Sequence, residues 1–486
     1  MVTCYSFELF ERDTKDDFHS IETTAKSIWM PDQVKCNWRI YGESSQEGAC
    51  NRNWGWHKKE QMLYERWQKV ARERRNETAL RDLGSGQSWT FAQLGREAEK
   101  SLPDHPGMVF PQGHSPEFVF TVLRAWRRSI VVCPLESHHQ PLTVSTPPAL
   151  CCHLKTTPAT TGAPRTVAFT EEQLAADAEN IVATMELRPE WPNLGVISMA
   201  YSYGFSNLVL PLLLHGIPLF LAPSPLPEIL RGAAKARWDV TLAGVPALWH
   251  AWHKAGAILH NVRLAISAGA PLPLALERAV FEQHGIKIHN FYGSTECGGI
   301  AYDATEVPRT DEASVGQPMK SVKVSAGTDG VLLVRSRAVG ETYWPEPEEK
   351  LGKGVFQTCD LGELKNGEVL LRGRTSDHIN VAGRKVSPAI IEQALREHKA
   401  VGECLVFGVP SSDAHRIDLI VACVTVEAGS TKDDLKQFLL QKLPSWQVPR
   451  EWWFVKSLGA NGRGKISRAQ WRRNFLESRA KPVAQA

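Results

Sequence analysis

The sequence has 486 residues, enough for one large domain and a second, smaller one. Its formal net charge of +3 is too small to indicate a nucleic acid or an acidic membrane surface as a partner. The ten cysteines are irregularly spaced and include no C-x-x-C pair, so they favour a reducing, cytoplasmic location over a disulfide framework. No apolar run approaches the ~20 residues of a membrane helix, and we expect no membrane span.

The first 61 residues show no sustained periodicity and carry scattered Trp and Cys. We expect a disordered extension, or a start codon placed too far upstream, with Met62 as the true start; a structured cap is the alternative. From Met62 the pattern becomes regular. Met62–Asn76 and Glu117–Arg128 have helical spacing, and Ile130–Cys133 has the composition of a buried strand.

Between residues 194 and 289, apolar runs of strand length alternate with stretches of helical length. The runs are Leu194–Ala200, Ile217–Ala222, Val240–Gly244, Val262–Ser267 and Ile286–His289, and the helical stretches are Pro225–Lys235, Pro246–Ala257 and Leu272–His284. This alternation predicts a mostly parallel sheet buried between helices. Shorter runs at Val322–Ser325, Gly330–Ser336 and Glu368–Arg372 indicate a small β-rich subdomain.

The last hundred residues have a different pattern from the parallel sheet. Helices are expected at Pro388–His398 and Lys432–Lys442, with strands at Gly402–Gly408 and Ile417–Val426 between them. The predicted fold is therefore α/β: a large N-terminal domain of several subdomains, residues 62–373, with mostly parallel sheets and a β-rich part. A small α+β lid domain, residues 374–486, follows it.

The stretch from Asn290 to Glu296 follows the last apolar run of the alternating region. Open α/β sheets place ligands beyond the carboxyl ends of their strands. The stretch offers an amide, a flat ring, a glycine, hydroxyls and a carboxylate, which suit a purine base, a phosphate and a divalent cation. It therefore predicts a nucleotide site.

Four motifs, in this order, extend that prediction. They are Thr157-Pro-Ala-Thr-Thr-Gly-Ala-Pro-Arg165; Tyr292-Gly-Ser-Thr-Glu296; Thr358-Cys-Asp-Leu-Gly362 followed by Gly373-Arg-Thr-Ser-Asp377 and Gly383-Arg-Lys-Val386; and Gly464-Lys465-Ile-Ser-Arg468. Together they resemble the adenylate-forming (AMP-binding) superfamily, in particular acyl- and aryl-CoA synthetases. The resemblance covers roughly Leu63 to Arg473.

The resemblance implies an enzyme that uses ATP and Mg²⁺ to convert a carboxylic acid into an acyl-adenylate and pyrophosphate. The acyl group then passes to a thiol, either that of CoA or the phosphopantetheine of an acyl-carrier protein. Lys465 would bridge the carboxylate and the α-phosphate, and Thr295 would donate to the α-phosphate. Glu296 would hold Mg²⁺ together with phosphate oxygens.

The resemblance also assigns the rest of the ATP site. Thr157, Thr160, Thr161, Gly162 and Arg165 would hold the outer phosphates; Gly269, Ala270, Asn290, Tyr292, Gly293 and Ser294 would surround the nucleotide; Asp360 would contact the ribose, Arg374 the ribose or a phosphate, and Lys385 a phosphate. Pro158 and Ala159 replace the small residues usual in this loop, and Arg165 replaces a lysine. We therefore expect a stiffer phosphate loop.

The acid and thiol sites are assigned in the same way. Tyr201, Tyr203, Gly298 and Gly299 would line the acyl pocket, Ser376 and Asp377 would form the lid's hinge, and Gly383 would line the thiol tunnel. The two glycines suggest free space and so an extended or flat apolar acid. The absence of Asp from residues 201–210 disfavours amino acids.

Two alternatives to a CoA ligase remain open. The same motifs would serve an acyl-AMP ligase that loads a carrier protein. The altered phosphate loop also allows a binding homologue that has lost turnover, although the retained Lys465, Glu296 and Asp360 argue against it.

Overall fold

The computed structural model describes residues 62–102, 107–136, 146–157, 165–234, 238–258, 260–381, 384–411, 418–426, 430–459 and 467–480. The expected N-terminal extension lies outside these ranges. The largest hydrophobic core belongs to residues 63–369, and separate cores belong to residues 379–475. The predicted boundary at residue 374 stays a prediction.

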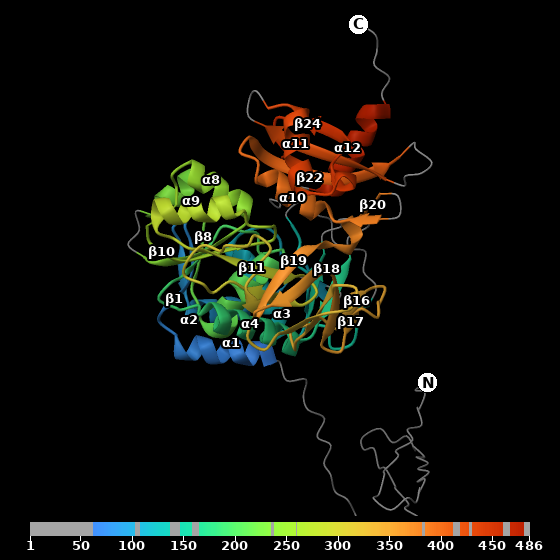
Figure 1. Ribbon diagram of the computed structural model, residues 1–486. Coiled ribbons are helices and arrows are strands. Elements are labelled where there is room, and N and C mark those ends of the chain that lie inside the picture. The colour runs from blue at the N-terminus through green and yellow to red at the C-terminus, as the bar shows by residue number, and fades with distance from the viewer. Residues whose placement is uncertain are drawn as a thin grey trace, which may run out of the picture. The chain divides into compact units, whose positions relative to one another are not determined.

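A nine-stranded sheet forms the centre of the N-terminal part, in the order β13-β12-β11-β10-β9-β7-β8-β1-β2. Figure 1 labels β1, β8, β10 and β11 of this sheet. Its strands are β1 (Thr78–Asp82), β2 (Ser88–Thr90), β7 (Asn193–Gly195), β8 (Leu219–Leu221), β9 (Val240–Gly244), β10 (Val262–Ala268), β11 (Ile288–Ser294), β12 (Gly298–Tyr302) and β13 (Gln317–Pro318). The run from β1 to β11 is parallel, and the outer pairs are antiparallel. The predicted mostly parallel sheet is thus confirmed.

Two further sheets complete the N-terminal part. One has the order β16-β6-β5-β4-β3, and the other, wholly antiparallel, has the order β14-β15-β18-β17 with β19 also paired to β18. Their strands are β3 (Met108–Val109), β4 (Val131–Val132), β5 (His153–Thr156), β6 (Thr166–Phe169), β14 (Lys323–Ala326), β15 (Val331–Arg335), β16 (Thr342–Trp344), β17 (Leu351–Gly352), β18 (Val355–Lys365) and β19 (Glu368–Arg374). The β-rich subdomain is the antiparallel sheet.

Helices cover the nine-stranded sheet: α8 and α9 pack against β10 and β11, α4 packs against β12, and α3 against β1. The helices of the N-terminal part are α1 (Met62–Glu73), α2 (Phe91–Glu99), α3 (Pro116–Arg127), α4 (Glu171–Met185), α5 (Ser202–Gly204), the π-helix η1 (Phe205–Val209), α6 (Leu210–His215), α7 (Pro227–Ala234), α8 (Pro246–Lys254) and α9 (Leu274–His284). Capping boxes begin α2, at Thr90 and Gln93, and α4, at Thr170 and Gln173.

The C-terminal part has the predicted α+β composition. Its elements are η2 (Thr375–Asp377), β20 (Ile379–Val381), β21 (Arg384–Val386), α10 (Pro388–Arg396), β22 (Val401–Pro410), β23 (Asp418–Val426), α11 (Lys432–Lys442), η3 (Ser445–Gln447), β24 (Glu451–Phe454) and α12 (Arg468–Ala480). Strands β22, β23 and β24 form one sheet. The predicted lid elements are therefore present with nearly the expected bounds.

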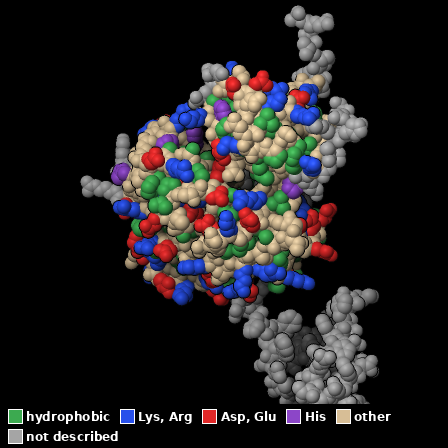
Figure 2. Space-filling view, in the orientation of Figure 1, with side chains coloured by type: hydrophobic (Ala, Val, Ile, Leu, Met, Phe, Trp, Pro, Cys, Tyr) green, Lys and Arg blue, Asp and Glu red, His purple; other side chains and the backbone are tan. Residues whose placement is uncertain are grey.

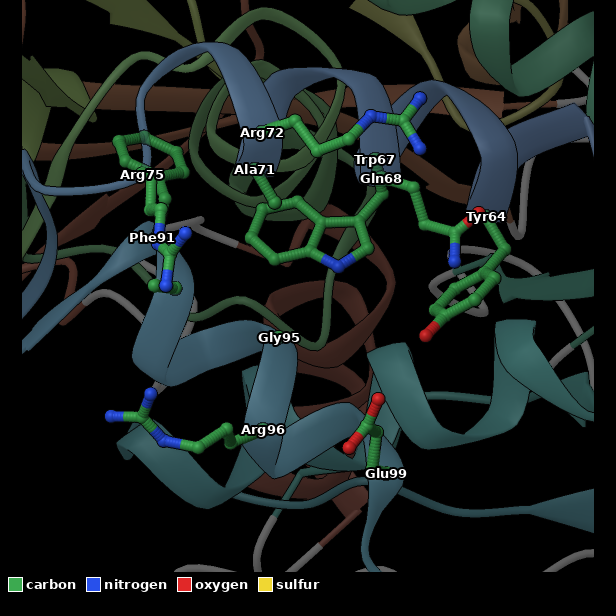
Figure 3. A pocket seen from close by; sticks show the side chains of 11 residues that line it. Tyr64, Trp67, Gln68, Ala71, Arg72, Arg75, Phe91, Gly95, Arg96 and Glu99 are labelled. Carbon is green, nitrogen blue, oxygen red and sulfur yellow. The ribbon is translucent and has the colours of Figure 1, made fainter.

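On the face shown in Figure 2, acidic and basic side chains are interspersed. A groove between α1 and α2 has Trp67 and Phe91 at its floor and Arg72, Arg75 and Arg96 around it (Figure 3). None of its lining residues belongs to the predicted site. Within the described ranges, no helix is both long and apolar enough to cross a membrane.

Candidate active site

The predicted nucleotide motif lies on a β-hairpin. We expected a strand to end at His289, but β11 continues to Ser294, and only residues 295–297 form the turn. The extension arises because β12 pairs antiparallel with β11, from Phe291 opposite Tyr302 to Ser294 opposite Gly298. A Cβ on Gly293 would lie 2.6 Å from the Gly298 carbonyl oxygen, so the tight pairing requires glycine there.

Three predicted nucleotide-site residues, Tyr292, Asp360 and Arg374, are joined by hydrogen bonds at Asp360. Its Oδ2 accepts a 2.6 Å hydrogen bond from the Tyr292 hydroxyl, and its Oδ1 accepts one of 2.6 Å from Arg374 Nε. The pairing of β18 with β19 places Asp360 directly opposite Arg374. Burial, and then the charge of Asp360, raise the pKa of Tyr292 well above its usual value, so the phenol remains a donor.

A second group joins the predicted metal ligand to the phosphate loop. The Tyr343 hydroxyl donates to Glu296 Oε1 at 3.0 Å, and the Arg165 guanidinium lies 4.1 Å from the centre of the Tyr343 ring. Arg165 also pairs with Glu348, and this hydrogen bond raises the Arg165 pKa. Sequence reasoning missed Tyr343, which is distant from both partners in the chain: the pairing of β16 with β6 brings it beside Arg165, and the Gly340 N–H bonds to the Glu296 carbonyl at 2.8 Å.

The phosphate loop is closed at its base by its two end residues. The Thr157 N–H and hydroxyl donate to the Arg165 carbonyl oxygen at 2.6 and 3.0 Å, and the Arg165 N–H donates to the Thr157 hydroxyl at 3.2 Å. The Thr157 hydroxyl therefore serves the loop's closure. Thr160, Thr161 and Gly162, together with the substituted Pro158 and Ala159, lie outside the described residues.

The predicted base-side residues are held in place by the protein itself. Gly269 follows β10 with φ of +87°, a backbone that favours glycine, and Ala270 comes next. The Asn290 side chain donates to the Ser314 carbonyl at 3.3 Å, and Ser294 Oγ lies 3.3 Å from Cys297 Sγ. Thr295 stands at the turn, partly exposed.

A buried four-charge cluster, defined by Glu277, Lys287, Asp303 and Arg309, supports this hairpin. Lys287 pairs with both carboxylates, and Arg309 Nε lies 2.9 Å from Glu277 Oε2. Arg309 also donates to the Ser314 carbonyl, which accepts from Asn290 as well. The cluster thus fixes Asn290 indirectly.

The predicted acyl-pocket residues come from two segments. Tyr201 precedes α5, and the Tyr203 hydroxyl donates to the Gly244 carbonyl at 3.3 Å, with its ring 5.9 Å from that of Phe291. The second segment is Gly298-Gly299, at the start of β12.

The expectation that Gly298 and Gly299 leave free space is wrong. A Cβ on Gly298 would lie 2.0 Å from Asp177 Oδ1, and one on Gly299 would lie 2.3 Å from Met319 Sδ. Gly298 also has φ of +68°. Glycine stands there because neighbouring side chains fill the space, and the inference of an extended acid drawn from these glycines loses its basis.

Two predicted motifs of the lid meet at Arg468. Its guanidinium pairs with Asp377 of the hinge and, at 2.6 Å, with Glu392, and its Nε donates to the Val406 carbonyl at 2.7 Å. Lys465 and Gly383 lie outside the described residues, as do the side chains of Ser376 and Lys385.

The donor set fits a magnesium ion only if the substrate supplies ligands too. Among the described residues, no group of three or more His, Cys, Asp or Glu side chains could hold a metal. One carboxylate oxygen of Glu296 accepts a hydrogen bond from the Tyr343 hydroxyl, and the second oxygen can bind a cation. One carboxylate plus phosphate oxygens and water is a usual arrangement for Mg²⁺.

Comparison with known proteins gives consistent matches. Residues 136–344 match the model of the AMP-binding enzyme family, and residues 390–465 match that of the AMP-binding enzyme C-terminal domain. The chain is 30% identical to an anthranilate–CoA ligase of Pseudomonas aeruginosa, over 67% of each protein. It is 27% identical to a long-chain-fatty-acid–CoA ligase of Bacillus subtilis, over 65% of this chain and 60% of that one.

Solved structures match over most of the chain. The ATP-bound MatB of Rhodopseudomonas palustris superimposes with a TM-score of 0.75 at 19% identity, over 86% of this chain and 99% of that one. The o-succinylbenzoate–CoA synthetase of Bacillus subtilis, bound to its acyl-adenylate, gives 0.70 at 19% identity, over 84% and 97%. At these identities the likeness is one of fold.

Proposed function

The chain belongs to the AMP-binding, adenylate-forming family and is an ATP-dependent ligase of the acyl- and aryl-CoA synthetase type, and we propose that it joins a carboxylic acid to CoA through an acyl-adenylate. The relatives are named for anthranilate, long-chain fatty acids and succinylbenzoate. We take aryl and alkyl carboxylic acids as the substrate class.

In the first half-reaction a carboxylate oxygen bonds to the α-phosphorus of ATP, and the bond from that phosphorus to the bridging oxygen breaks, releasing pyrophosphate. Two anions must approach each other, so the site needs fixed positive charge and donors. Lys465 and Thr295 take these roles at the α-phosphate, and Arg165 faces the departing pyrophosphate. Mg²⁺, held by Glu296 and phosphate oxygens, would neutralise charge on the triphosphate.

In the second half-reaction the thiol of CoA loses its proton to water, its sulfur bonds to the acyl carbon, and AMP leaves with the electron pair of the broken carbon–oxygen bond. Asp360 and Arg374 hold the ribose through both steps. Each Asp360 oxygen has one protein donor and a second lone pair, so it can still accept from a ribose hydroxyl.

The observation that carries the proposal is the meeting of Glu296 and Arg165 at Tyr343. A carboxylate suited to a cation and a guanidinium suited to a phosphate are held by one side chain, at the base of the phosphate loop. A site for an uncharged ligand would have no chemical need of this arrangement.

Pyrophosphate release with a panel of aryl and alkyl acids tests the proposal, with CoA and a phosphopantetheine-bearing carrier protein as alternative acceptors. Arg165→Gln should lower kcat/KM for ATP about tenfold or more, since a hydrogen bond to a charged phosphate is lost. Arg188→Gln is the matched control, because Arg188 also lies over an aromatic ring, 5.0 Å from Trp191, but outside the site. Absence of pyrophosphate with every acid would refute the proposal. Transfer only to the carrier protein would show that the acceptor is the carrier protein and not CoA.

A further inference from the structure

A buried ion pair, Lys155–Asp177, lies outside the residues that we assign to the reaction. Lys155 Nζ is 3.1 Å from Asp177 Oδ2, and the two side chains are 2% and 1% exposed. Lys155 also donates to Ser206 Oγ at 3.0 Å and lies 4.6 Å from the centre of the Phe169 ring. Removing two charges from water is costly, and well-packed apolar residues often stabilise a core as well or better. A role besides stability is therefore worth seeking.

Asp177 contacts Gly299, which we assign to the acid pocket, and Ser206, which lies shortly after the pocket residue Tyr203. Its Oδ2 accepts a 2.6 Å hydrogen bond from Ser206, which lies in η1, directly after the α5 turn that contains Tyr203. Its Oδ1 accepts from the Gly299 N–H at 3.3 Å and occupies the space that a side chain on Gly298 would need. One carboxylate thus lies between the two walls of the pocket.

Asp177 bonds to the backbone on one side and to a side chain on the other. Gly298 and Gly299 have no side chains, so on that side Asp177 accepts from the Gly299 N–H. The opposite wall, which contains Tyr203, continues directly into η1, a π-helix, which is a rare conformation that is frequent at functional sites. The π-helix begins beside Gly204, where a Cβ would lie 2.0 Å from the Ser198 carbonyl oxygen.

Lys155 adds a third element to this connection. It stands on β5, two residues before Thr157, where the phosphate loop begins. Its ammonium group neutralises Asp177 and shares Ser206 with it. The strand that leads into the phosphate loop and the two pocket walls therefore share one buried polar centre.

We propose that Asp177, held by Lys155, is a positioning residue that sets the separation of the two acid-pocket walls and thereby helps to determine which acids bind. The inference rests on the proposed function, since the pocket is assigned through it. Asp177 acts through the Gly299 backbone and the Ser206 side chain and does not itself contact the reacting groups.

Two double variants separate positioning from stability. Both Lys155→Met/Asp177→Asn and Lys155→Met/Asp177→Leu remove the buried charges together, so neither leaves an unpaired charge. The Asn side chain keeps an oxygen that can accept from the Gly299 N–H, and the Leu side chain does not. We expect the acid KM to rise about tenfold in the Leu variant and no more than about threefold in the Asn variant, with the ATP KM unchanged in both.

Backbone hydrogen exchange of residues 298–302, measured by mass spectrometry, gives a readout independent of activity. We expect faster exchange in the Leu variant than in the Asn variant. Equal exchange would overturn the inference, as would equal acid KM values or parallel rises in acid and ATP KM. If the wild-type protein released no pyrophosphate with any acid, the proposed function would fail, and exchange would still decide whether Asp177 fixes this backbone.

A third variant keeps the inference testable if the Leu variant does not fold. Ser206→Ala removes the bond to η1 and leaves the Lys155–Asp177 pair and the Gly299 bond in place. We expect a several-fold rise in the acid KM with the ATP KM unchanged, about what loss of one buried hydrogen bond produces. An unchanged acid KM would overturn the inference.

Discussion

Replacing Asp360 with Asn should weaken nucleotide binding through the ribose, without unfolding the protein. Asp360 is 7% exposed and accepts two 2.6 Å hydrogen bonds, from Tyr292 and Arg374. An Asn side chain can keep one acceptor toward Arg374 and turn its amide toward the Tyr292 hydroxyl, which can accept instead. The Arg374 side chain is 49% exposed and Asp360 is buried, so exchanging the ion pair for a neutral hydrogen bond should cost about 1–2 kcal/mol of unfolding free energy.

The loss in binding follows from the charge of the acceptor. Hydrogen bonds to a charged group contribute roughly 1.5–3 kcal/mol and those between neutral groups about 1 kcal/mol. The amide also has only one acceptor atom for two ribose hydroxyls. We therefore expect the binding free energy of ATP to weaken by about 1–2 kcal/mol, which raises its Kd roughly 5- to 30-fold.

Calorimetric titration with ATP and with 2′-deoxyATP isolates the ribose contact. The wild-type protein should bind 2′-deoxyATP more weakly than ATP. The difference in binding free energy between the two nucleotides should be about 1 kcal/mol smaller in the Asn variant. Arg372→Gln is the matched control, because Arg372 pairs with Glu363 at 2.6 Å on the same hairpin but in solvent. An undiminished preference for ATP in the Asp360 variant would refute the assignment of Asp360 to the ribose.

Three further predictions concern stability and catalysis. Burial holds the pKa of His153 well below its usual value, so only the unfolded state gains this proton on acidification; denaturant titration should show lower stability at about pH 5.5 than at about pH 7.5, and His153→Leu should reduce that difference. Glu277→Gln should lower the unfolding free energy by about 3 kcal/mol or more, because Lys287 and Arg309 lose a buried counter-ion; a loss below about 1 kcal/mol would contradict this. Lys465→Ala should abolish adenylate formation, because it raises the activation free energy of that step by ~3 kcal/mol or more. Transfer from a supplied adenylate should be spared, and equal losses in both half-reactions would count against this role of Lys465.

The sequence predicts the parts of the fold that local patterns encode. The bounds of β9 and α11 agree with the expected Val240–Gly244 and Lys432–Lys442, because apolar spacing and flanking breakers specify each element locally. The length of strand β11 was underestimated, because its end is specified by a distant partner and not by local spacing. Its last residues are polar, and they are extended only because β12 pairs with them.

The site was predictable where a motif stands together in the chain, and unpredictable where pairing brings distant residues together. Tyr292 and Asp360 were both expected at the nucleotide, and they share a hydrogen bond. Tyr343 is 47 residues from Glu296 in sequence and belongs to a different sheet, so only the packing of the two sheets brings them together. Asp177 looks like an ordinary polar residue of a helix until Lys155 is placed beside it.

The ends of the nine-stranded sheet bear on how the protein behaves at high concentration. A wide sheet with free edges is a template on which other chains can add strands and aggregate. Here one edge is β13, only two residues long, and one of these is Pro318, which has no N–H to donate. The opposite edge, β2, is three residues long. A strand from another molecule could form few backbone hydrogen bonds with either edge. The short edge strands therefore protect the folded enzyme from edge-to-edge aggregation.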